Sequence, residues 1–210
     1  MSSSVDWVAT GSMIQGIGTN LASLTVLLAA IIGANTFKGW RKQQFAARRA
    51  QEAEEILKAA YNARRAINQI RSPMMSGYEL ERAEEALRVN EKWDLELENR
   101  RKRLRTAQAY YHRLQHHQAA MEALDNTLPM ARALFGEALE HSLESLRHQF
   151  WIVQINVDSY IDDNGSDANF TKEIMYGMYK VKDEENEVTI TANAAVDIIE
   201  KICLPFLRLE

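Results

Sequence analysis

Closely spaced histidines come nearest to a pattern that could do chemistry. His112 and His116 are four residues apart, so a helix would place both imidazoles on one face, the arrangement that two ligands of one metal ion need. A metal site also needs a third ligand. A neighbouring helix could supply it from His141, His148, Glu137, Glu140 or Glu144.

The residues around these histidines argue against that site. A ferritin-like di-iron centre uses Glu-x-x-His pairs, and no histidine of this chain has Glu three positions before it. The HExxH motif is absent as well. His112 and His116 are therefore interpreted as solvated or helix-capping side chains, and neither a metal nor another cofactor is expected.

Other catalytic patterns are missing too. The chain has no phosphate-binding GxxxxGK[ST] loop and no GxSxG elbow. The single Cys203 stands in an apolar stretch and is interpreted as a packed residue. The acidic segment 162–167 lacks the spacing of an EF-hand. We assign no catalytic residue and expect a non-enzymatic protein.

The basic run Arg100–Arg105 is the densest in the chain. A helix spreads six consecutive residues around its circumference, and acidic residues precede the run at Glu91, Asp94, Glu96 and Glu98. The net charge of the chain is −4. The run is therefore interpreted as a solvated helix face, and nucleic acid is not an expected partner.

A window without charge, residues 7–37, indicates where the protein resides. Within it, residues 14–34 give 21 mostly apolar positions, about the number that a helix needs to cross a bilayer core of about 30 Å. A cleaved signal peptide is disfavoured because the preceding residues carry no Lys or Arg. A buried helix of a soluble protein is the other alternative. The pattern predicts a single transmembrane helix.

Residues at the two ends of this window fit a membrane interface. Trp7 and Trp40 flank it, and tryptophan prefers the headgroup layer. Cations follow at Lys38, Arg41 and Lys42, so the positive-inside rule places the N-terminus outside and the bulk of the chain in the cytosol. Two small-xxx-small pairs could bring two spans together; they are Ala29 with Gly33 and Ala30 with Ala34.

Long helices with few breaks are predicted for the remaining chain, which has only 9 Gly and 3 Pro in 210 residues. The expected domains are a short extracytosolic tail (1–13), the transmembrane helix with its cytosolic end (14–37) and a cytosolic helical bundle (38–210). We expect an all-α fold whose cytosolic part is an elongated antiparallel helical hairpin or bundle. Its predicted helices cover about 38–71, 79–124, 128–161, 170–179 and 191–207.

Breaks are expected at Pro73 and at Pro129, and Ser76 with Glu79 forms a predicted capping box. The helix over 38–71 is expected to continue the membrane span directly. Segment 188–191 alternates like a strand and could pair with 179–182, but an isolated two-stranded hairpin is marginal, so helix is preferred.

Charge separates along the chain: residues 38–71 carry a net +6 and residues 154–187 a net −6. Together these features favour a membrane-anchored scaffold or adaptor that holds partners, or copies of itself, at the cytosolic face. The alternative is a membrane-perturbing effector or channel subunit that oligomerises through its span. A third possibility is a sensor or enzyme whose site the sequence does not reveal.

Overall fold

Helices form all the regular structure that the computed structural model describes, which covers residues 7–179 and 186–208, with side chains from residue 29 onward. The predicted all-α class is confirmed as a packed seven-helix bundle. Two 3-10 turns, η1 (Trp93–Leu95) and η2 (Leu204–Phe206), accompany the helices. The helices are α1 (Trp7–Ile70), α2 (Gly77–Leu87), α3 (Glu98–His116), α4 (Gln118–Phe135), α5 (Glu137–Asp162), α6 (Ala168–Met178) and α7 (Glu187–Cys203).

Helix α1 is 64 residues long and passes without a break through the position of Gly39. The predicted continuity between the 38–71 helix and the segment before it is therefore confirmed. The chain divides into two compact units, residues 1–48 and 49–210, so α1 contributes to both. Its segment 49–70 is the part that belongs to the packed unit.

No helix that the structure describes is both long enough and apolar enough to cross a membrane. Most of the predicted span, residues 14–28, lies outside the residues whose side chains are described. The same holds for Trp7.

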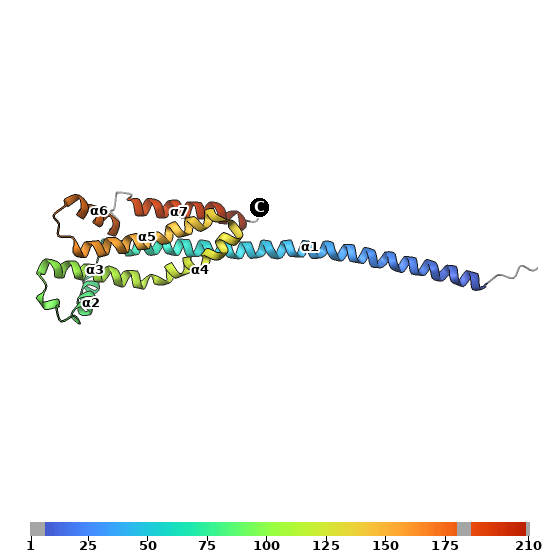
Figure 1. Ribbon diagram of the computed structural model, residues 1–210, viewed down its shortest axis with the longest axis horizontal. Coiled ribbons are helices and arrows are strands. Elements are labelled where there is room, and N and C mark those ends of the chain that lie inside the picture. Colours follow the sequence, from blue (N-terminus) through green and yellow to red (C-terminus); the bar gives the residue numbers. More distant parts are fainter. Residues whose placement is uncertain (1–6, 180–185, 209–210) are drawn as a thin grey trace, which may run out of the picture. The chain divides into compact units, whose positions relative to one another are not determined.

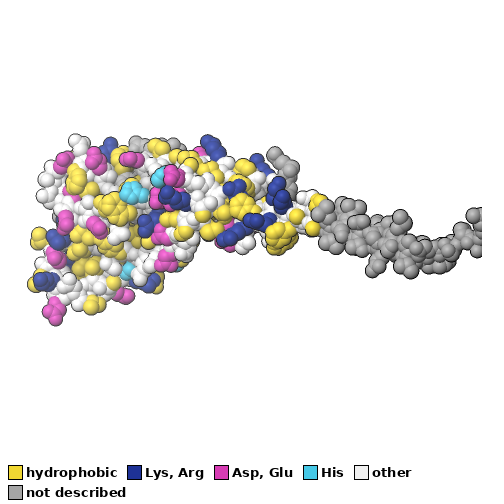
Figure 2. Space-filling model, turned by 45° about the vertical axis from the view of Figure 1, so that its right-hand side comes forward, with side chains coloured by type: hydrophobic (Ala, Val, Ile, Leu, Met, Phe, Trp, Pro, Cys, Tyr) yellow, Lys and Arg dark blue, Asp and Glu magenta, His cyan; other side chains and the backbone are white. Residues whose placement is uncertain are grey.

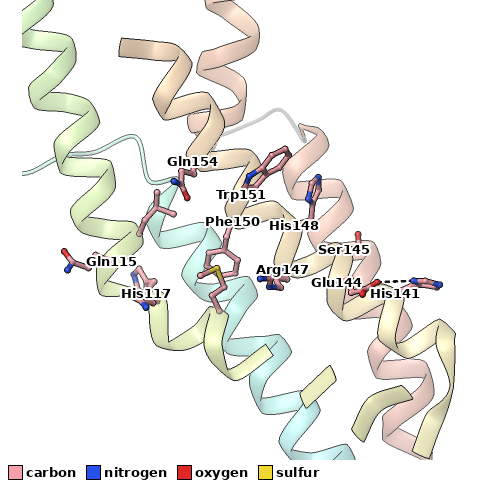
Figure 3. Close-up of a pocket in the computed structure, with 13 residues that line it drawn as sticks. Gln115, His117, His141, Glu144, Ser145, Arg147, His148, Phe150, Trp151 and Gln154 are labelled. Atoms are coloured by element: carbon pink, nitrogen blue, oxygen red, sulfur yellow. Dashed lines mark hydrogen bonds and ion pairs between the residues drawn. The ribbon is translucent and has the colours of Figure 1, made fainter. Parts of the chain in front are cut away.

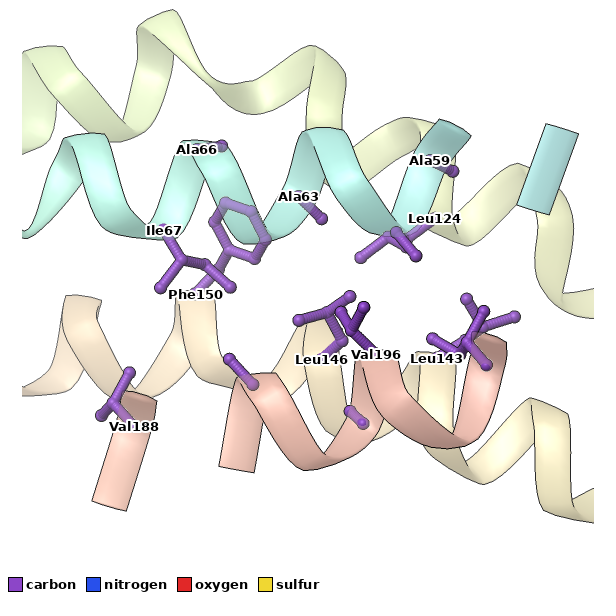
Figure 4. Packing of buried hydrophobic residues seen from close by; sticks show 14 of the residues in the cluster. Ala59, Ala63, Ala66, Ile67, Leu124, Leu143, Leu146, Phe150, Val188 and Val196 are labelled. Atoms are coloured by element: carbon purple, nitrogen blue, oxygen red, sulfur yellow. The ribbon is translucent and has the colours of Figure 1, made fainter. Parts of the chain in front are cut away.

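The core of the second unit is built around α5. This helix lies beside α7 and also contacts α3, α4 and α6 (Figure 1). Figure 4 shows Ala63 and Ile67 of α1 facing Leu146 and Phe150 of α5, with Val196 of α7 close by. The buried small residues of α1, spaced three or four apart, let neighbouring helices approach closely.

The single helix predicted over 79–124 is wrong, because the chain turns back after α2. The side-chain oxygen of Asn90 accepts a hydrogen bond from the Lys92 amide (3.0 Å), and η1 then carries Trp93 into a buried position. Helices α2 and α3 pack against each other across this turn. The longest helix wholly within the second unit, α5 with 26 residues, spans roughly 39 Å.

The helix boundary predicted at Pro129 is also wrong. Helix α4 runs through Pro129 and ends at Phe135. The break falls at Gly136, whose φ of +94° is a conformation that side-chain-bearing residues rarely adopt. The predicted helix over 128–161 is therefore divided between the end of α4 and α5.

The remaining predictions are closer to the structure. The capping box of Ser76 and Glu79 is present, and α6 and α7 begin two and four residues before their predicted starts. Segment 188–191 is helical, so the strand alternative is wrong there, while residues 180–185 lie outside the described part.

Candidate functional site

A groove of about 940 Å³ lies between the α3–α4 arm and α5. It opens where the arm bends at His117, the residue that ends α3 and precedes α4. The His117 amide donates to the carbonyls of Arg113 and Leu114, so the bend is a hydrogen-bonded turn. A volume of this size falls in the range of small-molecule and peptide sites.

Aromatic side chains give the groove an apolar surface. Phe150 is buried at its base, and Trp151 exposes 56% of its surface. The Trp151 ring lies 4.9 Å from that of His148 (Figure 3). An exposed tryptophan beside a concave surface is typical of the residues that dominate binding energy at interfaces.

The groove holds different histidines from those predicted. His117, His141 and His148 line it, whereas His112 and His116 line a smaller cavity of about 300 Å³ that includes Glu79 and Arg113. His117 lines both cavities. Among the described residues no group of three His, Cys, Asp or Glu side chains could hold a metal ion. His141 and His148 were considered only as sources of a third metal ligand. Sequence spacing did not place them beside His117, because α5 and the bend between α3 and α4 meet only in the fold.

The polar groups of the groove are arranged for binding. His141 Nδ1 lies 3.2 Å from Glu144 Oε2 (Figure 3). Arg147 forms an ion pair with Asp125 of α4. Burial, followed by the proximity of His116, lowers the pKa of His117, so its imidazole is neutral at pH 7. Within the described lining no nucleophile is paired with a base, and the groove is best suited to holding an apolar ligand or segment.

Arg71 is the most deeply buried charged residue that the structure describes, and sequence analysis did not single it out. It follows α1 and donates to the carbonyls of Tyr176 (2.9 Å), Gly177 (3.1 Å) and Tyr179 (2.8 Å) at the end of α6. It also donates to Thr189 Oγ1 (3.0 Å) in α7. Burial lowers the pKa of Arg71 to about 10. The guanidinium therefore caps α6, at the end where the helix dipole favours a cation.

Arg113 performs a similar role at the end of α1. It donates to the carbonyls of Ile70 (3.2 Å), Ser72 (2.6 Å) and Met74 (2.6 Å), and its Nε lies 2.7 Å from Glu79 Oε1. The hydrogen bond from Arg113 is the main reason that the pKa of Glu79 falls to about 2. The small cavity near His112 is thus bordered by a structural ion pair.

The basic run Arg100–Arg105 lies on α3, and several of its cations form ion pairs with acidic side chains. Arg100 pairs with Glu96 (3.3 Å), and Arg101 pairs with Glu98 (3.1 Å). Arg105 reaches across to Glu84 of α2 (3.1 Å). These contacts support the packing of α2 on α3.

The acidic segment 162–167 shapes the connection between α5 and α6. Asp163 accepts hydrogen bonds from the Gly165 amide (2.9 Å) and the Thr171 hydroxyl (2.6 Å), which lower its pKa. Asp167 caps α6. Cys203 is buried, and burial raises the pKa of its thiol to about 11, consistent with a packed residue.

Exposed apolar and basic side chains share the described part of α1 before residue 49 (Figure 2). Ile32 exposes 65% of its surface and Trp40 53%, and the Trp40 ring stacks on Phe37 at 5.9 Å. The predicted interface cations Lys38, Arg41 and Lys42 are exposed on the same segment. The predicted packing residues Ala29, Ala30, Gly33 and Ala34 are exposed too, and nothing lies within 4 Å of a methyl group built on Gly33.

No protein-family model matches the sequence, and the searches of curated proteins and of solved structures also returned no match.

Proposed function

We propose that this protein is a membrane-anchored, non-enzymatic scaffold that holds a partner at the cytosolic face of the membrane. The anchor is the segment 14–37, with the N-terminus outside. The second unit, residues 49–210, is the cytosolic part that presents the binding surface.

One observation carries the proposal: α1 is a continuous helix that runs from the chargeless window into the packed core of the second unit. Its residues Ile31, Ile32, Phe37 and Trp40 expose large apolar surfaces in water. A bilayer would cover such surfaces, at roughly 25 cal/mol for each Å² of apolar area removed from water. Cations at Lys38, Arg41 and Lys42 directly after the window support the proposed orientation.

The groove between the α3–α4 arm and α5 is the proposed docking surface. It offers an exposed indole, an apolar base and no paired catalytic groups among its described lining residues. These properties favour binding over chemistry.

An effector or channel subunit is the second candidate, and the open face of α1 favours it specifically. Ala29, Ala30, Gly33 and Ala34 leave room for a second helix to approach closely. Induced expression separates the candidates, because an effector would collapse the membrane potential and a scaffold would not.

Crosslinking in native membranes tests the scaffold proposal. The full chain should yield a defined adduct, and Trp151→Ala should reduce it because the exposed indole of the groove is lost. Phe170→Ala is a matched control, since Phe170 is exposed on α6, away from the groove lining. An adduct pattern unaffected by Trp151→Ala would contradict the groove's role. If the crosslinked products were solely adducts between copies of this chain, joined through the span, the result would favour the effector.

A further inference from the structure

Four cations on α1 lie in a segment that offers them no carboxylate. Lys38, Arg41, Lys42 and Arg48 form no ion pair with any described residue. Several cations of the second unit, among them Arg105, Arg113 and Arg132, do form ion pairs and lie 2.7–3.1 Å from carboxylates. The sequence explains the difference, because no acidic residue occurs between Asp6 and Glu52.

The four cations lie on one side of the helix, and two aromatic rings lie at the edge of that side and beyond it. At about 100° per residue, the four cations fall within an arc of about 120°, and adding Phe37 and Trp40 widens it to about 200°. Phe37 and Trp40 are stacked and more than half exposed. We call this group of six residues (Phe37, Lys38, Trp40, Arg41, Lys42, Arg48) the basic belt.

We propose that the basic belt binds the headgroups of anionic phospholipids in the leaflet that the helix crosses. This inference rests on the proposed membrane anchor, and it adds a preference for lipid charge that an apolar span alone does not have. The stacked aromatic pair lies at headgroup depth, and the cations contact phosphate and other anionic oxygens around it.

Distances along the helix match the interface. From the end of the predicted window at residue 37, Lys38 to Lys42 lie within about 8 Å along the axis, which is about the depth of one headgroup layer. Arg48 lies about 16 Å away, beyond one Debye length at physiological salt, and its contribution is smaller. Each near cation strengthens contact with an anionic lipid by about fivefold at low salt.

Charge complementarity selects this partner. The belt has no counterion within the described chain, so an anionic surface neutralises it without breaking an existing pair. An acidic protein or a nucleic acid would satisfy the cations but would leave Phe37 and Trp40 in water. A bilayer surface covers both kinds of side chain at once.

Electron spin resonance of the full chain, reconstituted in phosphatidylcholine vesicles with a minor fraction of phosphatidylglycerol, tests the proposal. Spin-labelled phosphatidylglycerol should associate with the wild-type protein at least about twofold more strongly than spin-labelled phosphatidylcholine. High salt should abolish that preference, since the belt is exposed. Replacing Lys38, Arg41, Lys42 and Arg48 together by Gln should also abolish it.

A matched control removes four exposed cations elsewhere: Arg65, Arg82, Lys172 and Lys201, each replaced by Gln. This variant should keep the lipid preference. Equal association of the two lipids with the wild-type protein, while phosphatidylcholine is still motionally restricted around it, would overturn the belt proposal and leave the anchor intact. A chain that neither floats with vesicles nor restricts any lipid would refute the anchor. Retention on heparin without a lipid preference would assign the belt to an acidic macromolecule and overturn the proposal.

Discussion

Replacing Arg71 by Met should destabilise the bundle more than removing the charge of any cation in α1. Met keeps much of the apolar stem and removes every donor. The Gly177 carbonyl then loses the Arg71 hydrogen bond, whereas the Tyr176 and Tyr179 carbonyls keep hydrogen bonds from Asn186. The buried guanidinium donates to three carbonyls at the end of α6 and to the Thr189 hydroxyl in α7. Removing it therefore affects the end of α6 and the start of α7 together.

The magnitude follows from these contacts. An acceptor that loses its hydrogen-bond partner costs about 1–3 kcal/mol. The Tyr176 and Tyr179 carbonyls each lose one of their two hydrogen bonds, which adds to this cost. Relief of the desolvation that lowers the pKa of Arg71 offsets part of the loss. We expect Arg71→Met to lower the free energy of unfolding by about 3 kcal/mol and Arg71→Lys by about 1–2 kcal/mol, because an ammonium lacks the planar fork.

Urea unfolding of the full chain in a mild detergent, followed by far-UV circular dichroism, measures this loss. Hydrogen exchange should locate the lost protection at the end of α6 and the start of α7. Arg65→Met is the matched control, since Arg65 is an exposed residue of α1 shortly before Arg71, and it should change stability by less than about 0.5 kcal/mol. An Arg71→Met protein as stable as this control would refute the reasoning.

Three further predictions concern the bundle. Arg113 holds the pKa of Glu79 near 2, below its usual value of about 4.5. The ionised Glu79 therefore adds to the free energy of unfolding above about pH 4.5, and this contribution is lost as the pH falls toward 2. Partial exposure reduces this contribution to about 1–2 kcal/mol, so Glu79→Gln should flatten the dependence of urea stability on pH in this range. Gly136→Ala should lower the melting temperature through about 1–3 kcal/mol of backbone strain, whereas Gly77→Ala, in open space at a helix start, should not. Iodide should quench the fluorescence of Trp151 more strongly than that of Trp93 in single-tryptophan variants, because Trp151 is exposed and Trp93 is buried.

Local patterns allowed the sequence to predict several elements. The capping box at Ser76 and the scarcity of Gly and Pro were sufficient to predict an all-α fold and the start of α2. Such signals depend on contacts within a few residues, which a sequence displays directly.

The failures came from breaks that carry no strong local signal. The Asn90 side chain accepts a hydrogen bond from the Lys92 amide in the turn after α2, and Pro129 is accommodated within α4. Trp93 lies in η1 between α2 and α3, inside the segment predicted as one helix over 79–124. The scarcity of Gly and Pro in that segment did not reveal the turn.

The groove and the Arg71 cap were invisible for a different reason. His117 and His148 line one groove although they lie about thirty residues apart in the sequence, and Arg71 acts on carbonyls more than a hundred residues away. Backbone carbonyls have no sequence signature. Arg71 therefore looked like one more cation of the basic segment after the window.

Alkaline carbonate extraction of native membranes that contain the full chain tests the membrane anchor most directly. The chain should remain in the membrane pellet, and deletion of residues 14–37 should release it, because that segment is the proposed span. A full-length chain that moves to the supernatant would contradict the account.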